Sequence, residues 1–208
     1  MPGTFRTLLS GGDFMGIMNI KKIIIFLLAI GVMAAAAGCA RWPDGPGPEP
    51  GETEYQLEIT VEVSGIIDSS NGIYYIVMDA DGNPAAGPGD YVSFWDDSFY
   101  YIKLEYGFFD FAQVQDDFES IFDGGSFSGN KIQITIALSD LGDPNSIDIN
   151  VVTTDSDNNT YDYLDNGYFT INTNLGSKPP ITDQENDSGD GGEDFDITKV
   201  TAVITTLY

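Results

Sequence analysis

The 208-residue sequence has no histidine, a single cysteine and few basic residues. The absence of histidine excludes Ser-His-Asp and Cys-His catalysis, and it excludes histidine-ligated zinc sites. Eight basic residues stand against 33 acidic ones, and the formal charge of −25 opposes binding to nucleic acid or to anionic lipid head groups. No motif singles out a pair of carboxylates for glycoside hydrolysis. We therefore expect no enzymatic activity and no nucleic-acid partner.

The only cysteine, Cys39, follows a short apolar segment and has no second cysteine with which to form a disulfide. Lys21 and Lys22 precede an uncharged apolar run over residues 23–37. This order is typical of a secretory signal peptide, and the run is shorter than the roughly 20 residues of a membrane-spanning helix. We predict a signal peptide over residues 1–38, with translation starting at Met15 or Met18. The alternative is a short anchor helix that is retained.

The residues Ala36-Ala37-Gly38-Cys39 resemble the lipobox of bacterial lipoproteins. The resemblance implies cleavage before Cys39, a diacylglycerol on its sulfur and an acyl chain such as palmitate on its new amine. Two or more acyl chains anchor a protein stably in a bilayer, whereas one chain does so only marginally. The resemblance therefore implies a lipid-anchored protein of the cell envelope that faces outside the cytoplasm. It leaves open the outer membrane or the outer face of the cell membrane.

The remaining chain is organised as a tether followed by short strands. Residues 39–54 are rich in Pro and Gly and predict an extended tether. From Tyr55 onward, apolar and polar residues alternate, as they do in half-buried strands. Further strands are predicted over 72–79, 90–96, 98–114, 130–143, 146–156 and 168–173, with a short helix over 116–122.

Many short strands with little helical periodicity predict an all-β fold, an antiparallel β-sandwich of the immunoglobulin-like or jelly-roll-like kind. We place this sandwich over residues 55–175. An acidic, Gly-rich linker is predicted over 176–195, and a last strand over 196–208 is predicted to dock on the sandwich.

Oxygen-bearing side chains recur at every second residue in the loop that contains Asp79, Asp81 and Asn83. Asp90 stands at the twelfth position counted from Asp79. Calcium binds several oxygen ligands from one tight loop, so these four residues are candidate calcium ligands. An EF-hand is excluded because Pro84 occupies the sixth position, which that loop reserves for glycine. The alternative is a polar turn, since turns favour the same residue types.

Two other acidic segments are predicted to have no bound ion. Residues 155–159 repeat the alternating spacing between two predicted strands, and we favour a hairpin turn there over a cation site. The acidic residues between 183 and 194 are typical of a solvated linker.

Aromatic residues are concentrated between positions 91 and 111. Neighbouring residues of a strand point to opposite faces, so the pairs 100–101 and 108–109 cannot all enter one core. Exposed aromatic rings can stack on sugar rings, which makes Trp95, Tyr100 and Tyr101 candidate ligand-binding residues. The alternative is ordinary core packing with some surface tyrosines.

Three short motifs resemble carbohydrate-binding module family nine and the related DOMON-like sandwiches. They are an Asp-rich loop after a strand at 79–83, a turn at 138–142 and the pair Asp162-Tyr163. The resemblance implies a β-sandwich that binds a sugar or another small ligand and that allows a stabilising calcium ion. We expect a non-catalytic surface lipoprotein that binds carbohydrate or another neutral ligand. The alternative is a structural or protein-interaction component of the envelope.

The lipid anchor leads to a first prediction. Replacing Cys39 with Ser should release the protein from membranes or leave an uncleaved precursor, because serine cannot accept the thioether-linked lipid. The measurement is sedimentation of membranes followed by immunoblotting, with Ala40→Ser as the control that keeps the cysteine. A Cys39→Ser chain that is still cut before position 39 and still sediments with membranes would contradict the lipoprotein interpretation.

Overall fold

The computed structural model describes residues 54–83, 86–116, 118–164, 167–174, 181–182 and 191–207. All of them belong to one of the two units into which the chain divides, Pro50–Tyr208. The predicted signal peptide with its two candidate start residues, the lipobox with Cys39 and the tether up to residue 53 lie outside the described residues. The predicted acidic linker is described only at 181–182 and 191–195.

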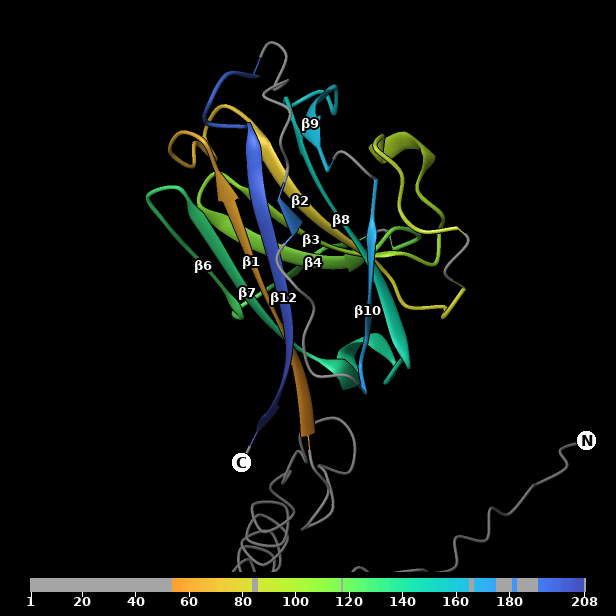
Figure 1. Cartoon of the computed structure of the whole chain (residues 1–208). Coiled ribbons are helices and arrows are strands. Elements are labelled where there is room, and N and C mark those ends of the chain that lie inside the picture. Colours follow the sequence, from red (N-terminus) through yellow and green to blue (C-terminus); the bar gives the residue numbers. More distant parts are fainter. Residues whose placement is uncertain are drawn as a thin grey trace, which may run out of the picture. The chain divides into compact units, whose positions relative to one another are not determined.

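Two antiparallel sheets pack face to face, which confirms the predicted all-β sandwich (Figure 1). Sheet A has five strands in the described part of the chain, in the order β11-β12-β1-β7-β6. Its strands are β1 (Glu54–Val63), β6 (Gly125–Ser128), β7 (Lys131–Ala137), β11 (Ile181–Thr182) and β12 (Ile197–Leu207).

Sheet B has seven strands among the described residues, in the order β10-β8-β2-β3-β4-β5, with β9 also pairing with β8. Its strands are β2 (Ile73–Asp79), β3 (Tyr100–Glu105), β4 (Phe108–Gln113), β5 (Ser120–Ile121), β8 (Ser146–Thr154), β9 (Thr160–Tyr163) and β10 (Phe169–Asn172). In the residues that were described, no helix is long and apolar enough to cross a membrane.

The strands of sheet A follow the alternation that predicts a half-buried sheet. In β1, Leu57, Ile59 and Val61 are buried, whereas the intervening Glu58 is exposed and Glu62 is half-buried. On the outer face, Glu62 forms ion pairs with Lys199 at 2.9 Å and Lys131 at 3.3 Å. The hydrogen bond from Lys199 is the main cause that lowers the pKa of Glu62. One face of sheet A therefore packs in the core and the other faces water.

The central strands of sheet B have apolar residues on both faces. Every residue of β2 is buried, and in β8 only Ser146 is not. The inner side chains, such as Tyr74, Ile76 and Ile149, join the core between the sheets. The outer side chains form a second cluster, the outer cluster, which consists of Ile73, Tyr75, Val77, Trp95, Phe99 and Val152.

The segment from residue 86 to 99 covers this outer face of sheet B. It contains a short 3₁₀ helix, η1 (Val92–Phe94). Asn150 Nδ2 in β8 donates a hydrogen bond to Pro88 O at 3.2 Å, and Trp95 Nε1 donates one to Gly89 O at 2.8 Å. The bond from Asn150 holds the segment, here called the covering loop, against the sheet, and the bond from Trp95 lies within the loop.

Two local predictions are wrong. The strand predicted over 90–96 is replaced by η1 and irregular backbone, because this aromatic segment crosses the outer face and does not join a sheet edge. The helix predicted over 116–122 is replaced by β5, which pairs Ser120 and Ile121 with β4. The Ser120 hydroxyl also donates to Phe111 O, so tertiary pairing overrides the weak helical pattern.

Strand β12 closes sheet A by pairing with β1 over its whole length, from Glu54↔Leu207 to Val63↔Ile197. The turn before β12 is fixed to sheet B. The Ile197 N–H donates to Asp162 Oδ2 at 2.6 Å, and Thr153 Oγ1 donates to Phe195 O at 2.9 Å.

The Phe195 ring stacks on Tyr74, with 5.3 Å between ring centroids. Gly72 is required beside this ring, because an added Cβ would lie only 2.4 Å from it. The side chain of Phe195 thus anchors the turn before β12 in the core.

The anchored turn leads to a stability prediction. Thr153→Val keeps the size of the side chain but removes the donor to the Phe195 carbonyl, which should lower the free energy of unfolding by about 1–3 kcal/mol. The control is Thr135→Val on the exposed face of β7, which should change it by less than about 0.5 kcal/mol. Urea unfolding measures both, and equal effects of the two substitutions would contradict the assigned bond.

Candidate ligand-binding site

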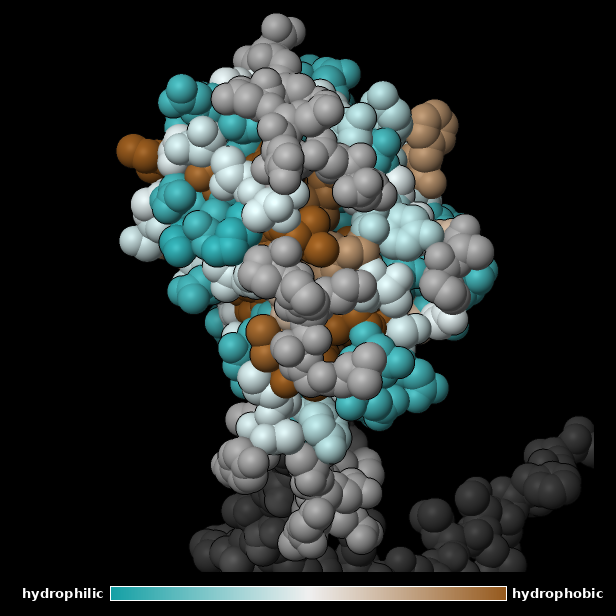
Figure 2. Space-filling model, viewed as in Figure 1, coloured by the Kyte–Doolittle hydropathy of each residue, from teal (hydrophilic) through white to brown (hydrophobic). Residues whose placement is uncertain are grey.

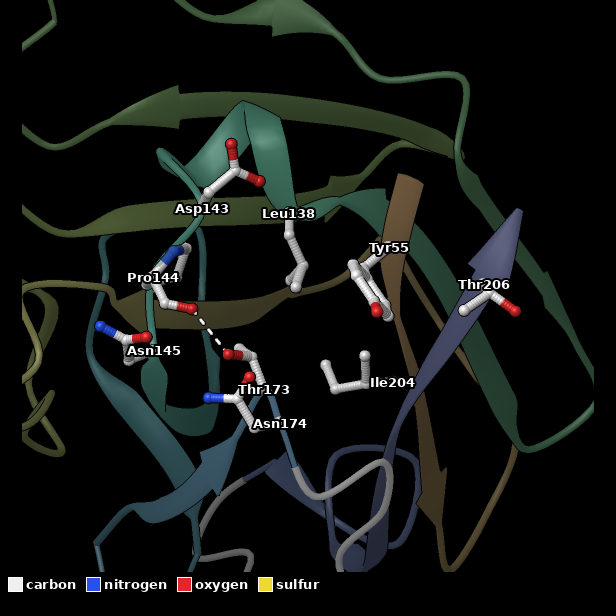
Figure 3. A pocket seen from close by; sticks show the side chains of 9 residues that line it. All are labelled: Tyr55, Leu138, Asp143, Pro144, Asn145, Thr173, Asn174, Ile204 and Thr206. Carbon is white, nitrogen blue, oxygen red and sulfur yellow. Dashed lines mark hydrogen bonds between the residues drawn. The ribbon is translucent and has the colours of Figure 1, made fainter. Parts of the chain in front are cut away.

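Two pockets of similar volume differ in chemistry. The end pocket has a volume of about 400 Å³ and lies where β1 begins and β12 ends (Figure 3). Leu138 and Ile204 point into it, and on one side of it Thr173 Oγ1 donates a hydrogen bond to Pro144 O at 2.7 Å. It has one aromatic ring, Tyr55, which is 47% exposed. Such a lining offers a ligand little aromatic surface.

The outer-face pocket has a volume of about 390 Å³ and lies on the outer face of sheet B beside the covering loop. Strands β2 and β3 form its floor, and the covering loop forms one wall. Its lining residues are Ile73, Tyr75, Val92, Trp95, Tyr101, Lys103, Glu105, Val114, Glu119, Ser156 and Asn158.

Three aromatic rings contact one another in the lining of this pocket. The rings of Tyr75 and Trp95 meet edge to face, with 5.3 Å between centroids and an interplanar angle of 83°. Tyr101 lies 6.0 Å from Tyr75 and 6.4 Å from Trp95. Edge-to-face pairs at these distances are favourable beyond their area of burial, so the three rings hold one another in position.

Hydrogen-bonding side chains lie beside these aromatic residues. Glu119 accepts bonds from the Tyr101 hydroxyl at 2.8 Å and from Lys103 Nζ at 2.7 Å. The Tyr75 hydroxyl donates to Asn158 Oδ1 at 2.9 Å. Lys103 also forms an ion pair with Glu105 at 3.3 Å. The pocket therefore offers both donors and acceptors at fixed positions.

Burial and neighbouring acids keep these groups in their protonated forms. Burial raises the pKa of the Tyr75 hydroxyl, and the charges of Glu105 and Glu119 add to the rise. Burial and the hydrogen bond to Glu119 raise the pKa of Tyr101. Burial lowers the pKa of Lys103, but Glu119 and Glu105 more than offset this and leave it above its ordinary value. Both hydroxyls remain donors at neutral pH.

The structure brings together two of the three predicted ligand-binding residues. Trp95 and Tyr101 both line the outer-face pocket. Tyr100 points to the opposite face of β3, where its ring stacks on Phe111 with 5.8 Å between centroids. The alternation predicted for this segment is also seen at Phe108 and Phe109, of which the first is 70% exposed and the second is buried.

Sequence reasoning missed six polar or aromatic residues of the pocket: Tyr75, Lys103, Glu105, Glu119, Ser156 and Asn158. They come from β2, β3, the segment before β5 and the turn after β8. The available signal was the sequence IYYIVMD, whose apolar residues on both faces of β2 indicate that something covers the outer face.

The four candidate calcium ligands have different surroundings. Asp79 is buried at the end of β2, and its Oδ1 accepts the Asp81 N–H at 2.9 Å. Asp81 and Asn83 are exposed, and Asp81 Oδ1 accepts the Asn83 N–H. Asp90 is half-buried, and burial raises its pKa. Within the described ranges, no group of three or more acidic or thiol side chains is arranged to hold a metal ion.

Residues 155–159 form the hairpin turn that connects β8 to β9, as predicted. Asp155 Oδ1 accepts the N–H groups of Asp157 and Asn159, and its Oδ2 accepts Asn159 Nδ2 at 2.7 Å. These bonds lower the pKa of Asp155, the side-chain bond from Asn159 most of all. The carboxylate is thus used to shape the turn.

Comparison with protein-family models, with curated proteins and with solved structures finds no match for this chain. The resemblance to carbohydrate-binding module family nine therefore remains a prediction from short motifs. The same holds for the lipobox.

The position of Trp95 leads to a third prediction. Trp95→Ala should lower the free energy of unfolding by about 3–5 kcal/mol, because its ring is 7% exposed and packs against Tyr75 and Tyr101. Phe94→Ala is the matched control, since this neighbouring ring is 81% exposed and should cost less than about 0.5 kcal/mol. Calorimetric melting compares them, and a fully stable Trp95→Ala protein would contradict the packing described above.

Proposed function

We propose that this protein is a non-catalytic, lipid-anchored module of the cell envelope that binds a neutral carbohydrate in the outer-face pocket. Cys39 carries the lipid and attaches the module to the outer membrane or to the outer face of the cell membrane. The observation that carries the ligand-binding proposal is the group of Tyr75, Trp95 and Tyr101 with hydrogen-bonding side chains around it.

The chemistry of the pocket supports a sugar as its ligand. A sugar ring has an apolar face that can lie against an aromatic ring, and hydroxyl groups that both donate and accept hydrogen bonds. The outer-face pocket has aromatic rings together with acceptors on Glu119, Asn158 and the Tyr75 and Tyr101 hydroxyls, and a donor on Lys103. These side chains already bond to one another, so a ligand would enter a site whose geometry is set in advance.

The charge distribution favours a neutral ligand over an anionic one. The described part of the chain has three lysines, and each forms an ion pair with one or more glutamates. Eight basic residues cannot neutralise 33 acidic ones, which leaves the formal charge of −25. A negative field of this kind repels anions and leaves neutral ligands unaffected.

The alternative function, a structural or protein-interaction component, has its own supporting observation. Two large apolar side chains near the edge of sheet B are almost fully exposed, Phe118 at 87% and Ile121 at 83%. Ile121 belongs to β5, which stands at the end of the strand order of its sheet. Exposed apolar residues at a strand edge suit contact with another protein.

The test compares two neighbouring tyrosines on opposite faces of β3. The full chain is purified in detergent and applied to an array of neutral and acidic glycans, and its best ligand is titrated by calorimetry. Tyr101→Ala should weaken binding at least about tenfold because it removes one aromatic wall and a hydroxyl acceptor. Tyr100→Ala should leave affinity unchanged, although it removes a ring that packs against the core.

Three outcomes would contradict the carbohydrate proposal. They are an array with no bound glycan, a preference for acidic glycans, and equal losses of affinity in the two tyrosine variants. If no glycan binds and Phe118→Ser abolishes cross-linking to envelope proteins in cells, the interaction alternative is favoured.

A further inference from the structure

Two buried carboxylates stand directly opposite each other on the outer face of sheet B. Asp79 in β2 and Asp148 in β8 are register partners. Asp79 continues the series Tyr75 and Val77, whose side chains enter the outer cluster. Asp148 alternates with Ile147 and Ile149, whose side chains enter the inner core. Residues paired in this way have Cβ atoms about 4.5–5.5 Å apart, and like charges there destabilise a sheet.

Each of these two aspartates has an oxygen atom without a partner. Asp79 is 2% exposed and Asp148 is 4% exposed. Asp79 Oδ2 and Asp148 Oδ1 are both buried, and neither has a hydrogen-bond partner in the described part of the structure. A buried carboxylate oxygen without a partner is costly, and two of them facing each other are more so.

Among the described residues, no lysine forms an ion pair with either aspartate, whereas an amide and a carbonyl oxygen lie farther along the same face. Asn150, two residues along the same face of β8, bonds to Pro88 O of the covering loop. Burial raises the pKa of Asp79, and the negative charges of Asp81 and Asp148 add to the rise, although the Asp81 N–H bond opposes it.

We propose that Asp79 and Asp148 bind one calcium ion between β2 and β8, at the end of the outer face nearest the 79–83 loop. The ion neutralises both carboxylates and satisfies the two free oxygens. Because only two carboxylates converge, backbone carbonyl groups and water complete its coordination. Of the four calcium ligands predicted from the sequence, this site includes Asp79, and it adds Asp148. Asp81 instead shapes the loop through its bond to Asn83.

Calcium suits this site better than magnesium does. Calcium accepts six to eight oxygen ligands at 2.3–2.6 Å in flexible arrangements that include carbonyl groups and water. Magnesium requires near-ideal octahedral geometry at about 2.0–2.1 Å and gives up its water reluctantly. Two carboxylates fixed by strand register, with irregular backbone beside them, match the more tolerant ion.

The first experiment measures calcium binding directly. The full chain in detergent is treated with chelator, dialysed and titrated with calcium at pH 7.5 by isothermal calorimetry. We expect one ion per chain at this site. Asp79→Asn and Asp148→Asn keep the shape of each side chain and should each weaken that binding at least about tenfold. Asp123→Asn, which removes one exposed charge from a turn, should leave it unchanged.

The second experiment separates a specific site from screening of negative charge. At a hundredfold excess over its dissociation constant, calcium should raise the melting temperature by about 5–10 °C, and magnesium and sodium at matched ionic strength should do much less. Equal rises in calcium and magnesium, or a calcium effect that survives both isosteric variants, would overturn the proposal. So would the absence of calcium binding by the wild-type chain, a measurement that needs no variant to fold.

Discussion

The central strands of sheet B are buried on both faces, and most of the functional features follow from this constraint. A sandwich needs only one apolar face per sheet, yet β2 carries large side chains on both faces, and β8 adds Val152 to the outer one. The outer face would cost much free energy if left in water, at about 25 cal/mol for each Å² of apolar surface. The covering loop removes that surface from solvent by placing Trp95 and Phe99 against Tyr75, Val77 and Val152.

The covering loop also explains why the pocket and the carboxylate pair lie on the same face. It covers the outer face incompletely, so a hollow remains over Tyr75 and Tyr101 at one part of the sheet. At another part, it lies over Asn150, close to where two aspartates have been withdrawn from water. The exposed side of sheet A differs, since the outward residues described there are mostly polar and partly paired as ions.

Figure 2 looks onto the edge of the sandwich where β12 and β10 lie. Hydrophobic surface is visible there along the middle of the molecule, near β12 and β10, with hydrophilic residues on either side (Figures 1 and 2). The segment between β5 and β6 connects the two sheets and bonds to both. The Phe122 N–H donates to Phe109 O in sheet B, and the Thr135 N–H of sheet A donates to Gly124 O.

Fold class could be predicted from the sequence because alternation along β1, β7 and β12 reports directly on burial of one face. The same alternation predicts that Tyr100 and Tyr101 point to opposite faces of their strand, although both were named as ligand-binding candidates. The pairing of Asp79 with Asp148 could not be predicted, because it depends on the register between strands 69 residues apart. The path of residues 90–96 was also beyond local reasoning, since strand propensity does not tell whether an aromatic segment joins a sheet or crosses its face.

The pairing of β1 with β12 has a consequence for the order in which the fold is made. These strands are first and last among the described elements, and β12 stands between β1 and β11 in sheet A. Sheet A therefore lacks an interior strand until all the other described strands have been made, and this pairing of distant strands raises its contact order. Domains with such long-range pairings fold slowly, after synthesis of their final strand. The pairing of sheet A is therefore complete only when β12 has been synthesised.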